Sequence, residues 1–168
     1  GMYIGSTTSY TENTWRWDPV KSKMIFSNIT FNPGLQKIYD EILMNATDRI
    51  HVEPTTDKIK IEVDKTSGEI TITNNGEGIP VVIHKEHKVH IPSLIFGEMM
   101  TSTNYDDKET RISAGTHGLG AKLTNIFSKY FKVETVDSNE GKKFTQTWEN
   151  NMDIVSKPKI VSFKGKPY

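Results

Sequence analysis

Residues 33–48 read PGLQKIYDEILMNATD, and this stretch has the pattern of an amphipathic helix. Apolar side chains recur at the three- and four-residue spacing of a stripe that faces a core. The stripe consists of Leu35, Ile38, Tyr39, Ile42, Leu43 and Ala46. Asn32 and Pro33 come directly before it, and they suit a helix cap and a first helical residue. The pattern therefore predicts a helix that begins near Pro33.

Three polar residues of the same stretch, Glu41, Asn45 and Asp48, are spaced four and three residues apart. At about 100° per residue they fall within about 60° of one another on the helix, beside the apolar stripe. A carboxylate, an amide and a second carboxylate in one column could hold a metal ion and a water molecule against a phosphate. The same column could also be an ordinary solvated flank of a helix.

Composition limits the classes of protein to consider. The 168 residues fit one domain, residues 1–168, and 35% hydrophobic with 25% charged residues is ordinary for a globular protein. Lys and Arg balance Asp and Glu at 21 each, so net charge draws this chain neither to nucleic acid nor to an anionic membrane. The absence of cysteine excludes disulfides and thiolate metal sites. We expect no membrane-spanning segment, and the abrupt ends lead us to expect a fragment of a longer chain.

The order of the remaining patterns predicts an α/β two-layer sandwich, a mixed β-sheet with helices on one face. Alternating apolar residues at 59–63 and 69–73, joined by Thr66-Ser67-Gly68, predict a β-hairpin. Helices are expected at residues 92–100 and from Leu119 to Tyr130. Three closing antiparallel strands are expected at residues 132–137, 142–149 and 159–163.

Two glycine-rich segments could contact a ligand. Asn74-x-Gly76-x-Gly78 ends a predicted strand, where glycines could let a flat ring approach the backbone, with Asn74 at a base edge and Ile79 as an apolar wall. Gly115-x-x-Gly118-x-Gly120 opens a predicted helix, where backbone N–H groups favour phosphate. Either segment could equally be a tight turn with no ligand.

The order of these three motifs resembles that of the GHKL superfamily of ATPases, which have the Bergerat ATP-binding fold. Within it, the chain is similar to the ATPase domains of eukaryotic type II DNA topoisomerases. The segments that carry this resemblance include residues 40–46 (DEILMNA), 74–80 (NNGEGIP), 101–107 (TSTNYDD) and 148–152 (WENNM). The chain departs from the pattern at Arg49, where Asn is expected, and at Thr116 and His117, where Arg and Asn are expected.

The resemblance implies ATP and Mg²⁺ as cofactors, with Glu41 as the general base for the attacking water and Asn45 as the Mg²⁺ ligand. It implies that Asp48 supports the site, that Asn74 bonds the adenine edge, and that Gly78, Ile79 and Phe96 line the base pocket. The residues implied for ribose and phosphate contacts are Ser102, Thr103, Asn104, Gly115, Thr116, His117, Gly118, Leu119, Gly120, Ala121 and Lys122.

The function that the resemblance implies is ATP hydrolysis that drives dimerisation and DNA strand passage in a type II DNA topoisomerase. We then expect a homodimer on ATP binding, duplex DNA bound through other domains, and a nuclear location for a cellular eukaryotic enzyme. The transducer and DNA-cleavage domains are expected outside these residues, so this fragment should bind ATP but hydrolyse it weakly. A nucleotide-dependent switch, such as a chaperone or mismatch-repair relative, and a histidine kinase remain as alternatives.

Overall fold

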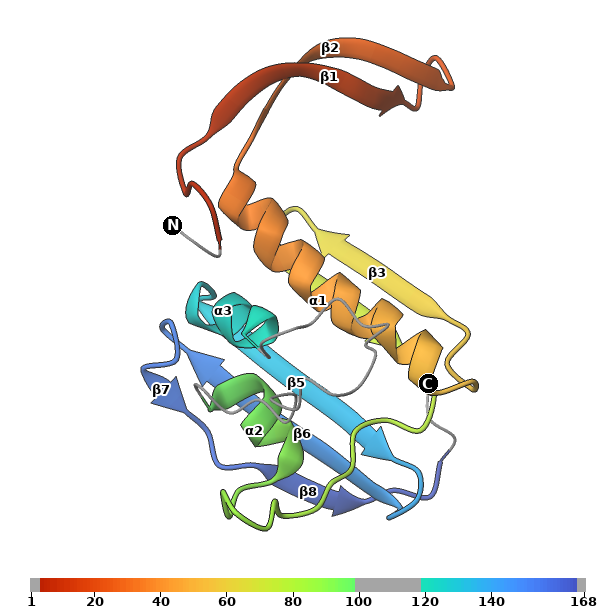
Figure 1. Cartoon of the computed structure of the whole chain (residues 1–168), viewed down its shortest axis with the longest axis vertical. Helices are drawn as coiled ribbons and strands as arrows, with labels where there is room; N and C mark the ends of the chain where they lie inside the picture. The colour runs from red at the N-terminus through yellow and green to blue at the C-terminus, as the bar shows by residue number, and fades with distance from the viewer. Residues whose placement is uncertain (1–3, 99–118, 166–168) are drawn as a thin grey trace, which may run out of the picture. The chain divides into compact units, whose positions relative to one another are not determined.

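The computed structural model describes residues 4–98 and 119–165 (Figure 1). The chain divides into two compact units, Gly1–Asp40 and Glu41–Tyr168, and each is described separately. The division falls within helix α1 (Pro33–Val52). All three polar residues of the α1 column lie in the second unit.

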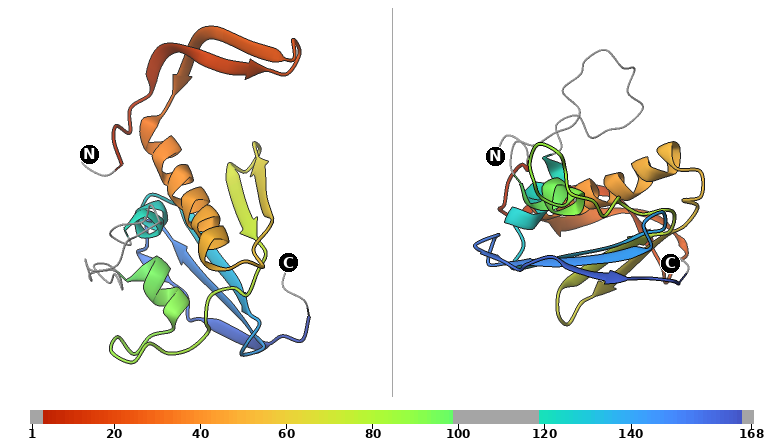
Figure 2. Two further views of the ribbon diagram at one scale, coloured as in Figure 1. Left: turned by 45° about the vertical axis from the view of Figure 1, so that its right-hand side comes forward. Right: turned by 90° about the horizontal axis from the view of Figure 1, so that it is seen from below.

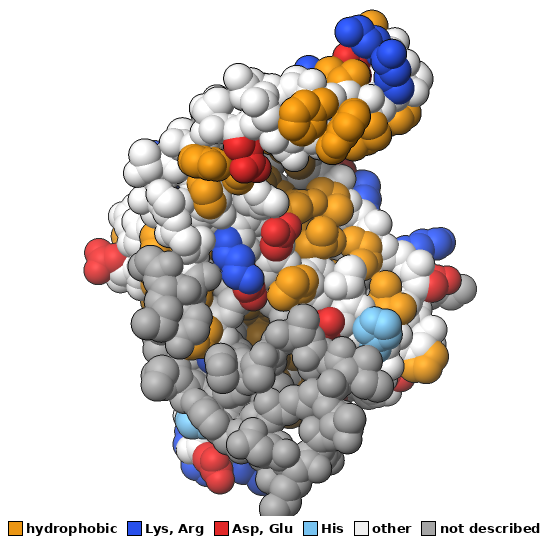
Figure 3. All heavy atoms as spheres, turned by 45° about the horizontal axis from the view of Figure 1, so that its top comes forward, with side chains coloured by type: hydrophobic (Ala, Val, Ile, Leu, Met, Phe, Trp, Pro, Cys, Tyr) orange, Lys and Arg blue, Asp and Glu red, His pale blue; other side chains and the backbone are white. Residues whose placement is uncertain are grey.

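The first unit contains an antiparallel hairpin of strands β1 (Tyr10–Asp18) and β2 (Lys23–Phe31). Its turn is held by the Asp18 carboxylate, which accepts the backbone N–H groups of Val20 at 2.9 Å and Lys21 at 3.1 Å. Trp15 pairs with Phe26 across the strands, with ring centroids 5.4 Å apart, and both side chains are exposed. Hydrophobic side chains at the surface of the molecule are orange in Figure 3. The alternation of residues 21–31 predicts a strand, which β2 confirms, whereas no strand was predicted at β1.

Helix α1 begins as predicted. The Asn32 side-chain oxygen accepts the backbone N–H of Leu35 at 2.9 Å, which satisfies one of the donors that a helix start leaves unpaired. The prediction that the apolar stripe is buried is only partly confirmed. Ala46 is 6% exposed, but Leu35 is 56% exposed. Leu35 lies in the first turn of the helix, within the first unit.

The second unit contains two antiparallel sheets. Strands β3 (Ile59–Asp64) and β4 (Glu69–Asn74) form the predicted hairpin. Strands β5 (Tyr130–Asp137), β6 (Lys142–Glu149), β7 (Ile154–Val155) and β8 (Lys159–Ser162) form a four-stranded sheet in which β6 pairs with β5, β7 and β8. The expected α/β class is confirmed, but the strands among the described residues form three antiparallel sheets in place of one mixed sheet.

Helices α2 (Ile91–Gly97) and α3 (Gly120–Ile126) lie on one face of the four-stranded sheet (Figure 2). Side chains that alternate along β5 and β6 build the core under them. The core cluster consists of Val81, Val133, Phe144 and Trp148, with Phe96, Phe131 and Met152 packed against it. Gly97 lets α2 approach closely, since a Cβ there would lie 2.9 Å from the Trp148 ring.

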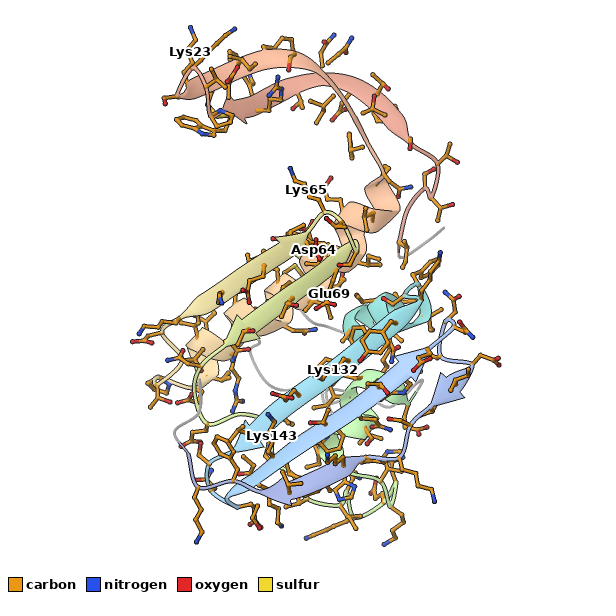
Figure 4. All side chains as sticks on the ribbon, turned by 180° about the vertical axis from the view of Figure 1, so that it is seen from behind. Lys23, Asp64, Lys65, Glu69, Lys132 and Lys143 are labelled. Atoms are coloured by element: carbon orange, nitrogen blue, oxygen red, sulfur yellow. The ribbon has the colours of Figure 1, made fainter. Side chains whose placement is uncertain are left out.

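The opposite face of this sheet carries charged side chains, next to the buried Val136. Lys132 and Lys143 lie on strands β5 and β6 (Figure 4), and both reach the Glu134 carboxylate, at 3.7 Å and 2.7 Å respectively. This alternation of polar with buried residues is what a sheet covered on one face requires.

The α3 helix is shorter than predicted. The backbone N–H of Phe127 bonds to the Leu123 carbonyl and that of Ser128 to the Asn125 carbonyl, which closes the helix. Tyr130, expected on the helix, therefore begins β5. No described helix has the length and apolar character needed to cross a membrane.

Candidate functional site

The polar column lies on the second half of α1, as the helical spacing predicts. Glu41 and Asp48 are half-buried, whereas Asn45 is exposed one turn beyond Glu41. Ala46 is buried and fixes this part of the helix. The column therefore presents two partly shielded carboxylates and an accessible amide.

Glu41 lies against the start of α3. A Cβ added to Gly120 would overlap the Glu41 carboxylate and approach its Cβ to 3.1 Å. Glycine at this position lets the α3 backbone come this close to the carboxylate without any shift of the Glu41 side chain. The structure thus brings together the acidic residue of one predicted motif and the last glycine of another.

Leu119 directly precedes α3, and Ala121 and Lys122 lie in its first turn, both buried. Lys122 is 1% exposed, and burial lowers the pKa of its ammonium group, with a smaller opposing effect of the Glu98 carboxylate. The other expected phosphate and ribose contacts lie outside the described residues; they are Ser102, Thr103, Asn104, Gly115, Thr116, His117 and Gly118.

Residues 74–78, which begin at the last residue of β4, form a tight turn with two glycines at positive φ, +111° at Gly76 and +80° at Gly78. The glycines accommodate protein neighbours. A Cβ at Gly78 would overlap the Val136 carbonyl of β5, and one at Gly76 would overlap Thr56 and Glu53. The close packing of the chain on itself is therefore sufficient reason for both glycines, and approach of a flat ring stays a prediction.

Strand β5 holds the segment that follows the turn. The Thr135 hydroxyl accepts the backbone N–H of Ile79 at 2.9 Å, and the Asp137 carboxylate accepts that of Val81 at 2.8 Å. Ile79 is half-buried, as an apolar wall requires. Asn74 is also half-buried, and its amide group donates to the Asn75 carbonyl at 3.0 Å.

Phe96 packs on the core cluster, with its ring centroid 6.0 Å from that of Phe131. Its carbonyl accepts the side-chain amide of the buried Asn125 at 2.9 Å, which links α2 to α3. Its place in a base pocket stays a prediction.

Two residues that the motifs did not assign hold the turn from the side of α1. Arg49 donates from Nη2 to the Gly78 carbonyl at 3.0 Å. Glu53, directly after α1, accepts the backbone N–H of Glu77 at 3.2 Å. The sequence does carry a signal for Glu53: threonines two and three residues later, a spacing at which an acidic side chain bonds its own loop.

The donor set fits a magnesium ion that is held together with phosphates. The Asn45 amide oxygen is a hard ligand, and Mg²⁺ in proteins is commonly bound by few side chains and completed by water and substrate phosphates. The described residues contain no group of three His, Asp or Glu side chains that could hold a metal ion without such help.

Residues 31–151 match the family model of the histidine kinase-, DNA gyrase B- and HSP90-like ATPases. The chain belongs to this ATPase family. The match begins at the last residue of β2 and includes α1, the 74–78 turn and α3. The ATPase fold expected from the three motifs is therefore confirmed.

Within the ATPase family, the chain is similar to proteins named DNA topoisomerase 2. The chain is 48% identical to DNA topoisomerase 2 of Plasmodium falciparum over 99% of its length, and 49% identical to that of Acanthamoeba polyphaga mimivirus over 99%. It spans only 12% and 14% of those two proteins.

Solved structures of the same kind of ATPase region agree with this fold. The ATPase region of Saccharomyces cerevisiae topoisomerase II superposes with a TM-score of 0.94 and 45% identity, over 98% of this chain and 44% of that one. The ATPase and transducer domains of DNA topoisomerase II from Balamuthia mandrillaris give a TM-score of 0.92 and 43% identity, over 96% of this chain and 41% of that one.

Proposed function

We propose that this chain binds ATP with Mg²⁺ at the surface formed by the α1 column, the 74–78 turn and the start of α3, and that it contributes to ATP hydrolysis there. The observation that carries the proposal is the Glu41 carboxylate against the glycine backbone of α3, with the Asn45 amide one turn away. A general base beside a phosphate-binding helix start, with a metal ligand next to it, is an arrangement suited to phosphoryl transfer to water.

The residues then have distinct roles. Glu41 accepts the proton of the attacking water and orients it, while Asn45 holds the metal ion and Asp48 supports the next turn. Asn74 bonds the adenine edge, Ile79 lies against the base, and residues 115–122 surround the phosphates. The metal ion, when bound, neutralises charge that develops on the phosphate oxygens.

We further propose that this ATPase unit belongs to a type II DNA topoisomerase, in which ATP binding drives dimerisation and passage of one duplex through another. The relatives named DNA topoisomerase 2, similar along nearly the whole of this chain, support that assignment over a chaperone or a histidine kinase. DNA contacts would come from other domains, and a cellular eukaryotic enzyme of this kind would act in the nucleus.

The proposal is tested by titrating a non-hydrolysable ATP analogue into the wild type and the Asn45→Ala variant, with Mg²⁺ and with EDTA. We expect wild-type binding to strengthen with Mg²⁺ and the variant to lose this dependence. Equal, metal-independent binding by both proteins would overturn the assignment of Asn45.

A further inference from the structure

The Glu53 carboxylate accepts four hydrogen bonds, although Glu53 belongs to none of the predicted motifs. It follows the last residue of α1 and is 6% exposed. Oε1 accepts the backbone N–H of Thr55 at 2.8 Å and its hydroxyl at 2.6 Å. Oε2 accepts the Thr56 hydroxyl at 2.8 Å and the backbone N–H of Glu77 at 3.2 Å. Hydrogen bonds to an ionised carboxylate are stronger than those between neutral groups. The bonds from Thr55, Thr56 and Glu77 lower the pKa of Glu53 to about 2, and the largest contribution is that of the Thr55 hydroxyl.

This carboxylate reaches the 74–78 turn directly. Beyond the bond to Glu77, the side chains of Glu53 and Thr56 occupy the space that a Cβ on Gly76 would fill. Thr56 is 1% exposed, and its single hydroxyl proton lies within reach of both Glu53 Oε2 and the Asn75 carbonyl, which is 3.1 Å away. The turn can adopt this position only because residue 76 has no side chain.

The loop after Glu53 holds the other side of the turn. Asn75 Oδ1 accepts the backbone N–H groups of Asp57 at 3.0 Å and Lys58 at 2.9 Å, and its amide donates to the Asp57 carboxylate at 2.8 Å. Asn74, the residue proposed to bond the adenine edge, is thus followed by backbone that is fixed at Asn75, Gly76 and Glu77.

We propose that Glu53 is a positioning residue for nucleobase recognition: its carboxylate fixes the backbone at Gly76 and Glu77 and thereby orients Asn74 for adenine. This inference rests on the proposed function, since it concerns the base end of the same nucleotide site. Glu53 acts through the turn and does not touch the nucleotide.

The substitution Glu53→Gln tests the role of the charge at nearly constant volume. All four neighbours of the carboxylate in the described structure are donors, from Thr55, Thr56 and Glu77. A glutamine amide replaces one acceptor oxygen with an NH₂ group. The threonine hydroxyls can turn to accept from it, but the backbone N–H on that side, of Thr55 or of Glu77, loses its acceptor.

Asp64→Asn is the matched control. Asp64 also accepts bonds within its own turn, from the Thr66 backbone N–H and the Ser67 hydroxyl, both at 2.8 Å. It lies at the β3–β4 turn (Figure 4), so this variant removes a comparable carboxylate from a turn that the proposal does not involve.

The experiment measures the Kd of the non-hydrolysable analogues AMPPNP and GMPPNP with Mg²⁺, by calorimetry or by competition, at a temperature where circular dichroism shows each variant folded. We expect Glu53→Gln to weaken AMPPNP binding about tenfold, as the loss of a charged hydrogen bond implies, and to change GMPPNP binding much less. The preference for adenine should therefore fall about tenfold, and Asp64→Asn should leave it unchanged. If Glu53→Gln does not fold, Thr56→Val carries the same test, because it removes the hydroxyl between Glu53 and Asn75.

The outcomes separate the two proposals. Equal weakening of both analogues, or an unchanged preference, would show that Glu53 only stabilises the fold and would overturn this inference while leaving ATP binding intact. A wild-type protein that binds neither analogue would overturn the proposed function and this inference with it.

Discussion

Glu41 and Glu53 are acidic residues twelve positions apart with different surroundings. Glu41 is half-buried against the backbone of Gly120, in the position expected of a group that meets a ligand at the start of α3. Glu53 is surrounded by protein donors, and its pKa is lowered to about 2. A carboxylate held ionised by four donors is a poor base, which is why we propose Glu41 for proton transfer and Glu53 for positioning.

The lowered pKa of Glu53 predicts a pH-dependent stability. Because the folded-state pKa lies below the ordinary value of 4.5, the ionised carboxylate stabilises the fold above about pH 4.5, and this contribution is lost as pH falls toward 2. We expect the Tm of the wild type to fall over this window and the Tm of Glu53→Gln to fall less, measured by thermal denaturation in a pH series.

Asp64 provides the comparison for that series. Its pKa is also lowered, chiefly by the Ser67 hydroxyl and then by the Thr66 backbone N–H, so Asp64→Asn should remove a separate part of the acid sensitivity. Identical Tm profiles for the wild type and Glu53→Gln below pH 4.5 would contradict the assigned network.

At the scale of elements, the site depends on how closely α3 approaches α1 within the second unit. Alanine is the better helix former, so Gly120→Ala would ordinarily stabilise α3. Here the added methyl group overlaps the Glu41 carboxylate. We therefore expect Gly120→Ala to lose the usual gain of about 1 kcal/mol, because the Glu41 side chain must move to make room for the methyl group, and to leave the free energy of unfolding unchanged or slightly lower, measured by urea denaturation.

A double-mutant cycle isolates this contact. In a Glu41→Ala background the overlap is gone, and Gly120→Ala should then cost little or should stabilise the chain. Additive effects of the two substitutions would contradict the contact between Glu41 and the α3 backbone.

The sequence was sufficient for the elements whose patterns are local. The 3.6-residue period predicted α1 and its column, and strict alternation predicted the β3–β4 hairpin, because each pattern reports one buried face. It was not sufficient for Leu35, because the helical period does not say how much of each apolar side chain the fold buries.

Contacts between distant segments were the part that the sequence could not supply. Glu53 and Glu77 are separated by 24 residues, and Gly78 and Val136 by 58, so only the fold brings these pairs together. The sequence pattern includes the glycines at 76 and 78, but it does not show why they are needed. In the structure the loop after α1 and strand β5 leave no room for a side chain at either position.

At the scale of the whole molecule, the chain spans 12% to 14% of the two relatives compared above, and 41% to 44% of the solved ATPase structures. We propose that hydrolysis needs a residue supplied by the transducer part of the longer protein. The isolated chain should then bind the ATP analogue but turn over ATP at least about tenfold more slowly than a protein that includes the transducer, measured by phosphate release. Equal turnover numbers would contradict this.

The most direct test of the central claim compares the wild type with Glu41→Gln in the longer protein, measuring AMPPNP binding and steady-state ATP hydrolysis on the same samples. If Glu41 is the general base of an ATP site, the variant binds the analogue within about threefold of the wild type and loses at least about a hundredfold in kcat. A variant that hydrolyses ATP at the wild-type rate would contradict the claim.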